Sequence, residues 1–225
     1  MPVSLTIIRY KKWLVPFALV AMVLHRLPLF LNKKIRFYKL LGCGSNGTFS
    51  KRPDWQQWGI LTVHKNELAA TALKKLYGGF IGGWYQFFGC KTITYVLQPI
   101  AGHGLWDGKE IFTKLNEPTE HTGPIAVLTR ATIHFSKLKN FWQHVNGVAE
   151  KMRTAKGFVT SYGIGELPWI KQATFSIWEN KEDMKAFAYT QAEHKEVIKK
   201  TRAEKWYSED MFVRFKIISV TGSLR

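Results

Sequence analysis

The sequence contains one structural pattern twice, and this duplication restricts the available folds more than any other feature. In the second half, segments typical of strands begin at Pro124, Gly157, Gln172 and Met211. Apolar residues at spacings of three and four predict helices after the first and third of these strands, along 138–152 and from about Lys181 to Ile198. The resulting order, βαββαβ, is that of a ferredoxin-like unit.

The first half shows the same order of elements. Strands are predicted at 5–10, 35–44, 58–65 and 92–100, and helices over 13–24 and 68–76. Three residue pairs also share one separation of 121 positions: Arg9 with Arg130, Gly42 with Gly163, and Gly44 with Gly165. We interpret the chain as a tandem duplication, with one repeat in residues 1–115 and the second in residues 120–225.

Two such repeats predict how a core can be formed. Each antiparallel sheet has one face covered by its own helices and another face that is still apolar. Packing the two bare faces together would give a barrel-like core with helices outside. This arrangement leaves a space between sheet and helices in which a flat hydrophobic ligand could bind.

Charge and composition limit the possible partners. The 33 Lys and Arg outnumber 16 Asp and Glu, giving a net charge of +17, and residues 1–52 hold ten basic side chains and no acidic one. Such a balance points towards nucleic acid, an anionic membrane surface or an acidic cofactor. A hydrophobic content of 46% excludes global disorder. With only Cys43 and Cys90, neither a disulfide framework nor a cysteine-based zinc site is expected.

The apolar run Trp13–Leu24 follows Lys11 and Lys12 and is similar to a signal peptide. Three features argue against that interpretation: a strand-like segment precedes the run, no small-residue cleavage site follows it, and it is shorter than the ~20 residues that span a bilayer. We expect a buried core helix. The alternative is a helix lying on a membrane, since further basic residues follow at Arg26, Lys33, Lys34 and Arg36.

The strongest candidate for chemistry is His194. It lies on the apolar stripe of the last predicted helix, seven residues after Phe187, and Ile198, Thr201 and Arg202 follow at helical spacing. An imidazole facing a cavity is a suitable axial ligand for heme iron, and an arginine two turns later could bind a propionate. A satisfied core histidine with a solvent-directed arginine would give the same pattern.

Other residues are less specific. Arg9 and Arg130 each end a predicted strand and are either internal ion-pair partners, cofactor anchors or ordinary sheet-edge charges. The glycine pairs are expected at bulges or turns. His64 follows a strand, and His103 has glycine on both sides, which predicts an exposed loop.

Motifs of other enzyme and binding classes are missing from the sequence. It has no HExxH, GxSxG, Walker loop or CxxC. The stretch KGFVTSY from Lys156 begins like the RNA-recognition signature but lacks its continuation, so nucleic-acid binding has no motif behind it.

Several longer motifs resemble the spheroidene monooxygenase family of bacterial carotenoid ketolases. They are LTRATI, FWQHV, GIGE and QATFSIWE in the second half, FAYTQAEHKEVIKKTRAEKWYSEDMFVRF near the end, and KLLGCG and PDWQQWGILTVHK in the first half. The resemblance implies a dimeric α+β barrel, here formed within one chain, a heme-dependent oxygenase and a hydrophobic polyene substrate.

We therefore predict a heme-binding monooxygenase that acts on a carotenoid-like substrate with dioxygen and an electron donor. His194 would ligate the iron, Arg202 and Arg130 would pair with propionates or orient the distal side, and Trp206 and Tyr207 would wall the pocket. The basic N-terminal layer predicts a cytoplasmic protein that rests on the inner face of a membrane. The alternatives are a non-catalytic carrier of heme or another lipophilic ligand, and a basic RNA- or membrane-surface-binding module.

Overall fold

The structure is a computed structural model that describes residues 1–45, 52–66, 72–112, 115, 121–190, 201 and 204–225. It contains two compact units. The first unit comprises Met1–Cys43, Asp54–Pro99 and Ile217–Arg225, and the second comprises Gly44–Pro53 and Ile100–Lys216.

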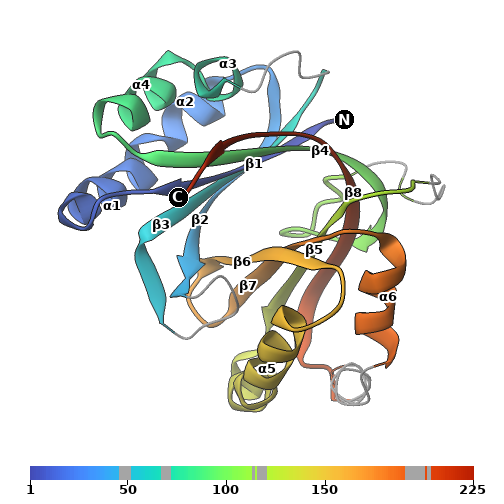
Figure 1. Cartoon of the computed structure of the whole chain (residues 1–225). Coiled ribbons are helices and arrows are strands. Elements are labelled where there is room, and N and C mark those ends of the chain that lie inside the picture. Colours follow the sequence, from blue (N-terminus) through green and yellow to red (C-terminus); the bar gives the residue numbers. More distant parts are fainter. Residues whose placement is uncertain (46–51, 67–71, 113–114, 116–120, 191–200, 202–203) are drawn as a thin grey trace. The chain divides into compact units, whose positions relative to one another are not determined.

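The sheet of the first unit contains β1 (Val3–Arg9), β2 (Ile35–Gly44), β3 (Pro53–His64) and β4 (Lys91–Gly104). β1 is central and pairs antiparallel with β3 on one side and β4 on the other, which gives the order β4-β1-β3-β2. Helices α1 (Val15–Leu24), α2 (Arg26–Leu31), α3 (Leu73–Tyr77) and α4 (Gly79–Phe87) lie over one face of this sheet (Figure 1).

The second unit repeats this arrangement. Its strands are β5 (Ile125–Ile133), β6 (Phe158–Leu167), β7 (Lys171–Trp178) and β8 (Tyr207–Ser223), and its helices are α5 (Leu138–Arg153) and α6 (Lys181–Thr190). β5 pairs antiparallel with β7 and β8, and β7 pairs with β6, so the order is β6-β7-β5-β8.

The two units therefore share one topology, in which the first strand lies between the third and the fourth. This confirms the predicted fold class, a tandem duplication of the βαββαβ unit in the dimeric α+β barrel class. The sequence patterns also placed the strands correctly, because short runs rich in β-branched residues and bounded by turn residues favour strands. The irregular pairing predicted near the second glycine pair is present, since the register of β6 shifts between Gly165 and Leu167.

The helix-facing side of the first sheet carries a buried hydrogen-bond network. The hydroxyl of Tyr77 on α3 lies 2.7 Å from Thr6 Oγ1 and 3.0 Å from Ser4 Oγ, and His64 Nε2 lies 2.7 Å from Thr62 Oγ1. All these side chains are at most 2% exposed. Since buried polar groups are costly unless they are paired, the network fixes α3 to β1 and β3.

A second buried histidine lies where α1 meets α2. His25 is 1% exposed, and its Nδ1 lies 3.1 Å from the Tyr85 hydroxyl of α4. Burial lowers the pKa of both His25 and His64 from 6.5 to about 4. Both imidazoles are therefore neutral in the folded protein at neutral pH.

This predicts an acid-sensitive fold. Between about pH 6.5 and about pH 4 the unfolded chain binds a proton at each histidine that the folded chain does not, so acidification favours unfolding. Each histidine can contribute at most about 3 kcal/mol over this window. We expect the free energy of unfolding, measured with denaturant, to fall through it. His64→Gln should flatten the fall, whereas His121→Gln, at a partly exposed site, should leave the slope unchanged.

The prediction of a buried core helix over 13–24 is wrong for most of that segment. Helical structure extends through α1 and α2 to Leu31, and of its apolar residues only Leu14, Ala18, Ala21 and Leu29 are buried. Most of the other large apolar side chains of the segment are exposed, including Trp13, Val23 and Phe30 at 71%, 69% and 75%. One stripe at helical spacing is enough to cover the sheet, and the remaining apolar residues face outwards.

Candidate cofactor and substrate site

The predicted site residues fall into two groups. His194 and Arg202 lie outside the described residues, so their proposed roles stay predictions. Arg130, Trp206 and Tyr207 are described and all belong to the second unit. The structure does not bring these three residues to one place.

Arg130, near the end of β5, is a buried cation held by three carboxylates. It is 1% exposed and pairs closely with Glu209, at 3.5 Å with Asp107 and at 3.5 Å with Glu166. Its guanidinium also lies 4.9 Å from the centre of the Trp106 ring. The arrangement is a saturated ion-pair cluster, as expected for a charge in a poorly solvated position.

The cluster also sets the ionisation of Glu209. Partial burial acts to raise the pKa of this carboxyl, but the backbone N–H groups of Gly108 and Asp107 and the Arg130 guanidinium outweigh burial and lower it. Glu209 is therefore a carboxylate at neutral pH. A propionate at Arg130 would have to displace a carboxylate of the protein.

The matched arginine of the first repeat is less constrained. Arg9 pairs with Asp54 at 3.4 Å, and its side chain is 41% exposed. Arg130 is therefore an internal ion-pair partner, whereas Arg9 forms an ion pair that is partly exposed.

Trp206 and Tyr207 lie on the opposite face of the second sheet. Trp206 is 1% exposed and packs with Ala131, Ile133, Phe141 and Trp142, against which Tyr207 also lies. Because side chains alternate along a strand, Ala131 and Ile133 project from the face of β5 away from Arg130, towards α5. Burial raises the pKa of Tyr207 to about 12, so its hydroxyl is protonated at neutral pH.

Within the part of the second unit that the structure describes, the helix-facing side of the sheet is left uncovered at Thr129. Along the helix-facing side of β5, Ile125 and Val127 are buried under α5 and α6, and Ala131 and Ile133 are buried under α5 and Trp206. Thr129, between these two pairs on the same face, is exposed. We name this opening the Thr129 gap.

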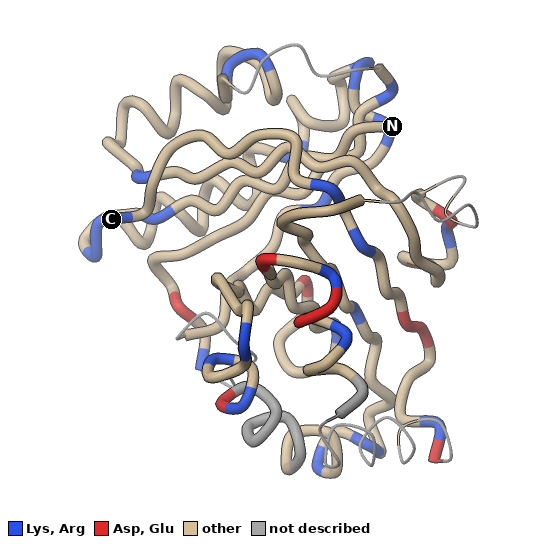
Figure 2. The backbone as a smooth tube through the Cα atoms, turned by 45° about the vertical axis from the view of Figure 1, so that its right-hand side comes forward, with Lys and Arg blue, Asp and Glu red and all other residues tan. Residues whose placement is uncertain are grey.

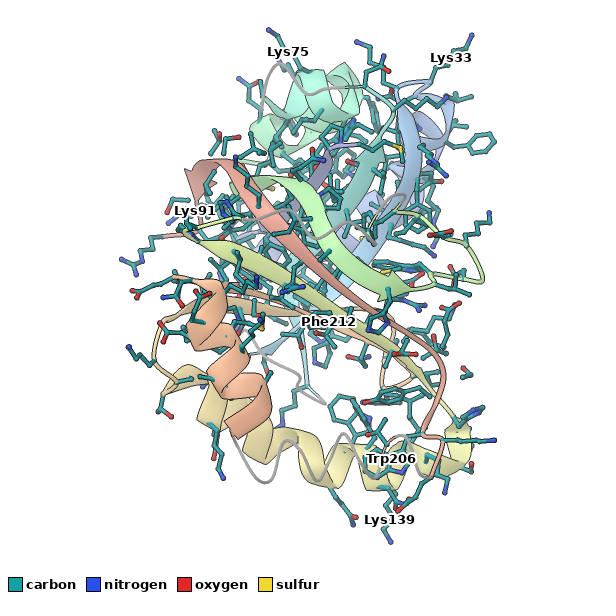
Figure 3. All side chains as sticks on the ribbon, turned by 90° about the vertical axis from the view of Figure 1, so that its right-hand side faces the viewer. Lys33, Lys75, Lys91, Lys139, Trp206 and Phe212 are labelled. Carbon is teal, nitrogen blue, oxygen red and sulfur yellow. The ribbon has the colours of Figure 1, made fainter. Side chains whose placement is uncertain are left out.

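The side chains beside the Thr129 gap combine apolar surface with polar groups. Thr129 is paired with Thr174 on β7 and with Phe212 on β8, and the next row of the same face contains Val127, Ser176 and Arg214. Phe212 is labelled in Figure 3, and Trp206 marks the end of the sheet beneath α5. Thr174 Oγ1 and Arg214 Nε are buried and have no hydrogen-bond partner among the described residues.

His103 lies next to this set and not on the exposed loop that its glycines predicted. It belongs to the end of β4 that lies in the second unit, and its ring is stacked 6.1 Å from that of Phe212, although the side chain remains exposed. A Cβ atom at Gly102 or Gly104 would collide with the backbone of β8 at Phe212–Val213 or Asp210–Met211. The flanking glycines therefore allow close strand approach.

The corresponding position of the first unit is closed. Residue 8 of the first repeat matches residue 129 of the second at the separation of 121 positions, and Ile8 is 0% exposed. It packs with Tyr10, Leu14, Ala18 and Tyr85 in one continuous core. Among the described residues, the matched position is therefore buried in the first unit, at Ile8, and exposed in the second, at Thr129.

The residues around the Thr129 gap fit a flat, largely apolar group that carries carboxylates, as heme does. Val127 and Phe212 supply apolar surface, and Arg214 supplies a cation with an unused donor. Within the described ranges no three His, Cys, Asp or Glu side chains converge on a metal ion, but heme needs only one axial imidazole from the protein. His194 belongs to the segment between α6 and β8, and His103 is a described imidazole that stacks on Phe212.

A surface pocket of about 500 Å³ lies elsewhere in this unit. It is lined by Leu138, Lys139, Trp142, Gln143 and Trp169, at the start of α5 and the turn before β7. This pocket contains none of the predicted site residues. Of its two indole rings, that of Trp169 is exposed and that of Trp142 is buried.

Sequence reasoning had missed Thr129, Thr174 and Arg214. A usable signal was present, because aligning the repeats places a polar Thr129 against the apolar Ile8. Arg214 could have been noticed as a charge between the apolar residues Val213 and Phe215 of the last strand.

Known proteins similar to this chain support one family. A spheroidene monooxygenase of Cereibacter sphaeroides is 36% identical over 200 residues, covering 88% of this chain and 59% of that protein. One of Rhodobacter capsulatus is 32% identical over 210 residues, covering 92% of this chain and 86% of that protein. The chain thus spans somewhat more than half of the first relative and most of the second. No protein-family model matches the sequence.

Solved structures show the same fold at low sequence identity. An aldoxime dehydratase in complex with butyraldoxime has a TM-score of 0.62 at 8% identity, covering 96% of this chain and 79% of that chain. Another aldoxime dehydratase has a TM-score of 0.59 at 10% identity, covering 96% and 80%. These likenesses concern the fold alone. Together with the duplicated βαββαβ topology, the identity to two relatives over most of this chain shows that it belongs to the spheroidene monooxygenase family of enzymes.

Proposed function

We propose that this chain is a heme-dependent monooxygenase that acts on a hydrophobic, carotenoid-like substrate at the Thr129 gap of the second unit. One observation supports this location for the active site: Ile8 of the first repeat is buried, whereas Thr129 at the matching position of the second repeat is exposed. The names of the relatives supply the reaction class and the type of substrate.

The reaction class fixes what must enter and leave the site. One atom of dioxygen enters the substrate and the other is reduced to water, which consumes two electrons from a donor and two protons. Bound heme would supply the iron that activates dioxygen. The protein would supply an imidazole for the iron, positive charge for the propionates, and an apolar surface that orients the polyene and excludes water.

Named residues take these roles. His194 is the proposed axial ligand, and Arg214 joins Arg202 as the proposed propionate partner, because Arg130 is already neutralised on the other face. Trp206, Tyr207 and Trp142 pack over Ala131 and Ile133, so they would form the boundary of the gap on that side of Thr129. The neutral Tyr207 hydroxyl adds no charge to this apolar boundary.

An absorption spectrum tests the cofactor assignment. Purified protein titrated with hemin should develop a Soret band with saturable intensity. His194→Ala should abolish or shift the band, whereas His121→Ala, at a partly exposed site, should leave it unchanged. A band that is lost in His103→Ala and kept in His194→Ala would refute His194 as the ligand, and no band in the unmodified protein would refute heme binding.

A further inference from the structure

We infer that the outer surface of α1 and α2 is a membrane-docking surface that lies flat in the interface of an anionic bilayer. This inference goes beyond the proposed oxygenase activity and does not depend on it. We call this surface the N-terminal apolar face. Its members are the exposed large apolar residues of the segment, Trp13, Phe17, Leu19, Val20, Val23, Leu24, Leu27, Phe30 and Leu31.

The exposure of this face is unusual for a helix that contacts only water. The segment Lys12–Leu31 has a mean hydropathy of 2.0 over its most apolar window, and only 28% of that window is buried. A helix that is apolar all round normally lies in a core or in lipid, and large exposed apolar patches mark interaction surfaces. The N-terminal apolar face is therefore expected to be covered by something apolar.

Basic residues surround the N-terminal apolar face, which favours an anionic partner surface. Exposed basic residues lie at both ends and at the break between the helices, namely Lys11, Lys12, Arg26, Lys33, Lys34 and Arg36. The first unit holds 13 Lys and Arg against two acidic residues, Asp54 and Glu67, so +11 of the total net charge of +17 lies in it. Figure 2 shows this distribution along the backbone, and Figure 3 shows Lys33 and Lys75 extending away from the helices. Lys and Arg beside an apolar helix favour anionic lipid, and Trp13 next to Lys11 and Lys12 is the combination found at headgroup level.

By length and composition alone this segment could also cross a bilayer, but its packing favours a position in the membrane plane. The helix is interrupted at His25, and Leu14, Ala18, Ala21, His25 and Leu29 form a stripe that is buried against the first unit. His25 accepts or donates a hydrogen bond with Tyr85, and the Phe17 ring lies 4.8 Å from that of Phe88, directly after α4. Crossing the membrane would break all these contacts, whereas lying flat keeps them and buries only the exposed residues.

Flotation with lipid vesicles tests this inference without heme or substrate. The protein should float with phosphatidylcholine vesicles that contain phosphatidylglycerol, and more weakly with phosphatidylcholine alone. The double variant Leu27→Ser/Phe30→Ser should lower the partition coefficient about tenfold or more, because two large apolar side chains no longer enter the interface. Phe135→Ser in the second unit is the matched control, since Phe135 is 83% exposed, and it should bind as the unmodified protein does.

A charge variant tests the lipid preference separately. Lys33→Glu should reduce binding to the anionic vesicles more than binding to phosphatidylcholine, and Lys139→Glu on α5 should have little effect. The inference is overturned if the unmodified protein floats with neither type of vesicle, or if Leu27→Ser/Phe30→Ser floats equally well. It is also overturned if gel filtration shows that Leu27→Ser/Phe30→Ser converts a dimer to a monomer without any flotation of the unmodified protein, because the face then covers a second copy of the chain.

Discussion

Replacing Arg130 with methionine is expected to lower the free energy of unfolding by about 3–5 kcal/mol, the range seen when one partner of a buried ion pair is removed. Arg130 is 1% exposed, and its removal would leave Glu209, Glu166 and Asp107 close together without their shared cation. Lys171 would still pair with Asp107 at 2.7 Å, but it does not replace the contacts to the two glutamates. Denaturant unfolding at neutral pH, followed by tryptophan fluorescence, measures the loss.

The first repeat supplies the control for this experiment. Arg9→Met removes the matched arginine, but Arg9 is 41% exposed and has one ion pair, so the expected loss is about 1 kcal/mol or less. Equal losses in the two variants would contradict the view that Arg130 neutralises a buried cluster. The effect of acid on this cluster also has a predictable direction. Because the pKa of Glu209 is lower in the folded than in the unfolded protein, the ionised carboxylate stabilises the fold fully above the unfolded-state pKa of about 4.5. This stabilisation is lost as the pH falls through the folded-state pKa.

Filling the Thr129 gap is expected to abolish or strongly weaken ligand binding. Thr129→Phe places an aromatic ring in the opening between Val127 and Ala131, where the first unit is covered over Ile8. We expect hemin affinity to fall about tenfold or more, which corresponds to about 1.4 kcal/mol or more. The fold should persist, because the substituted side chain is exposed and does not replace a packed residue.

The control is a substitution at the same position that keeps its volume. Thr129→Val removes the hydroxyl and leaves the opening, so it should bind hemin nearly as the unmodified protein does. Titration followed at the Soret band measures both variants, and circular dichroism checks their folding. Undiminished binding by a folded Thr129→Phe variant would show that the ligand does not occupy the Thr129 gap.

Most of the fold could be predicted from the sequence because its signals are local or repeated. The strands of the second repeat, such as β5 and β7, are short apolar runs with β-branched residues, and α5 has a clear helical period. The shared separation of 121 positions between Arg9 and Arg130 then related the two halves. By contrast, α4 (Gly79–Phe87) was missed, since its sequence GFIGGWYQF contains three glycines, which are unfavourable inside helices.

Predictions that depend on tertiary contacts were less accurate. Apolar composition alone cannot distinguish a core helix from one that faces lipid, so the exposure of Phe30 and Val23 followed only from the packing of the buried stripe. Glycines beside His103 are compatible both with a loop and with a close approach of two strands, and the structure shows a close approach of strands.

The candidate site likewise combines features that could be predicted from local sequence with features that depend on tertiary contacts. The helical spacing of Phe187 and His194 could be recognised locally, whereas the opening at Thr129 depends on which helices cover the sheet. The free donor of Arg214 also depends on tertiary contacts, because only the three-dimensional neighbours decide whether a charged group is paired.

Labelled dioxygen provides the most direct test of the proposed function. The heme-loaded protein, given an electron donor and a carotenoid such as spheroidene in detergent, should form an oxygenated product that carries the isotope from dioxygen and is absent without heme. Thr129→Phe should lose this product and Thr129→Val should retain it. A heme-loaded protein that binds the pigment but yields no labelled product would contradict the proposed oxygenase and favour a carrier.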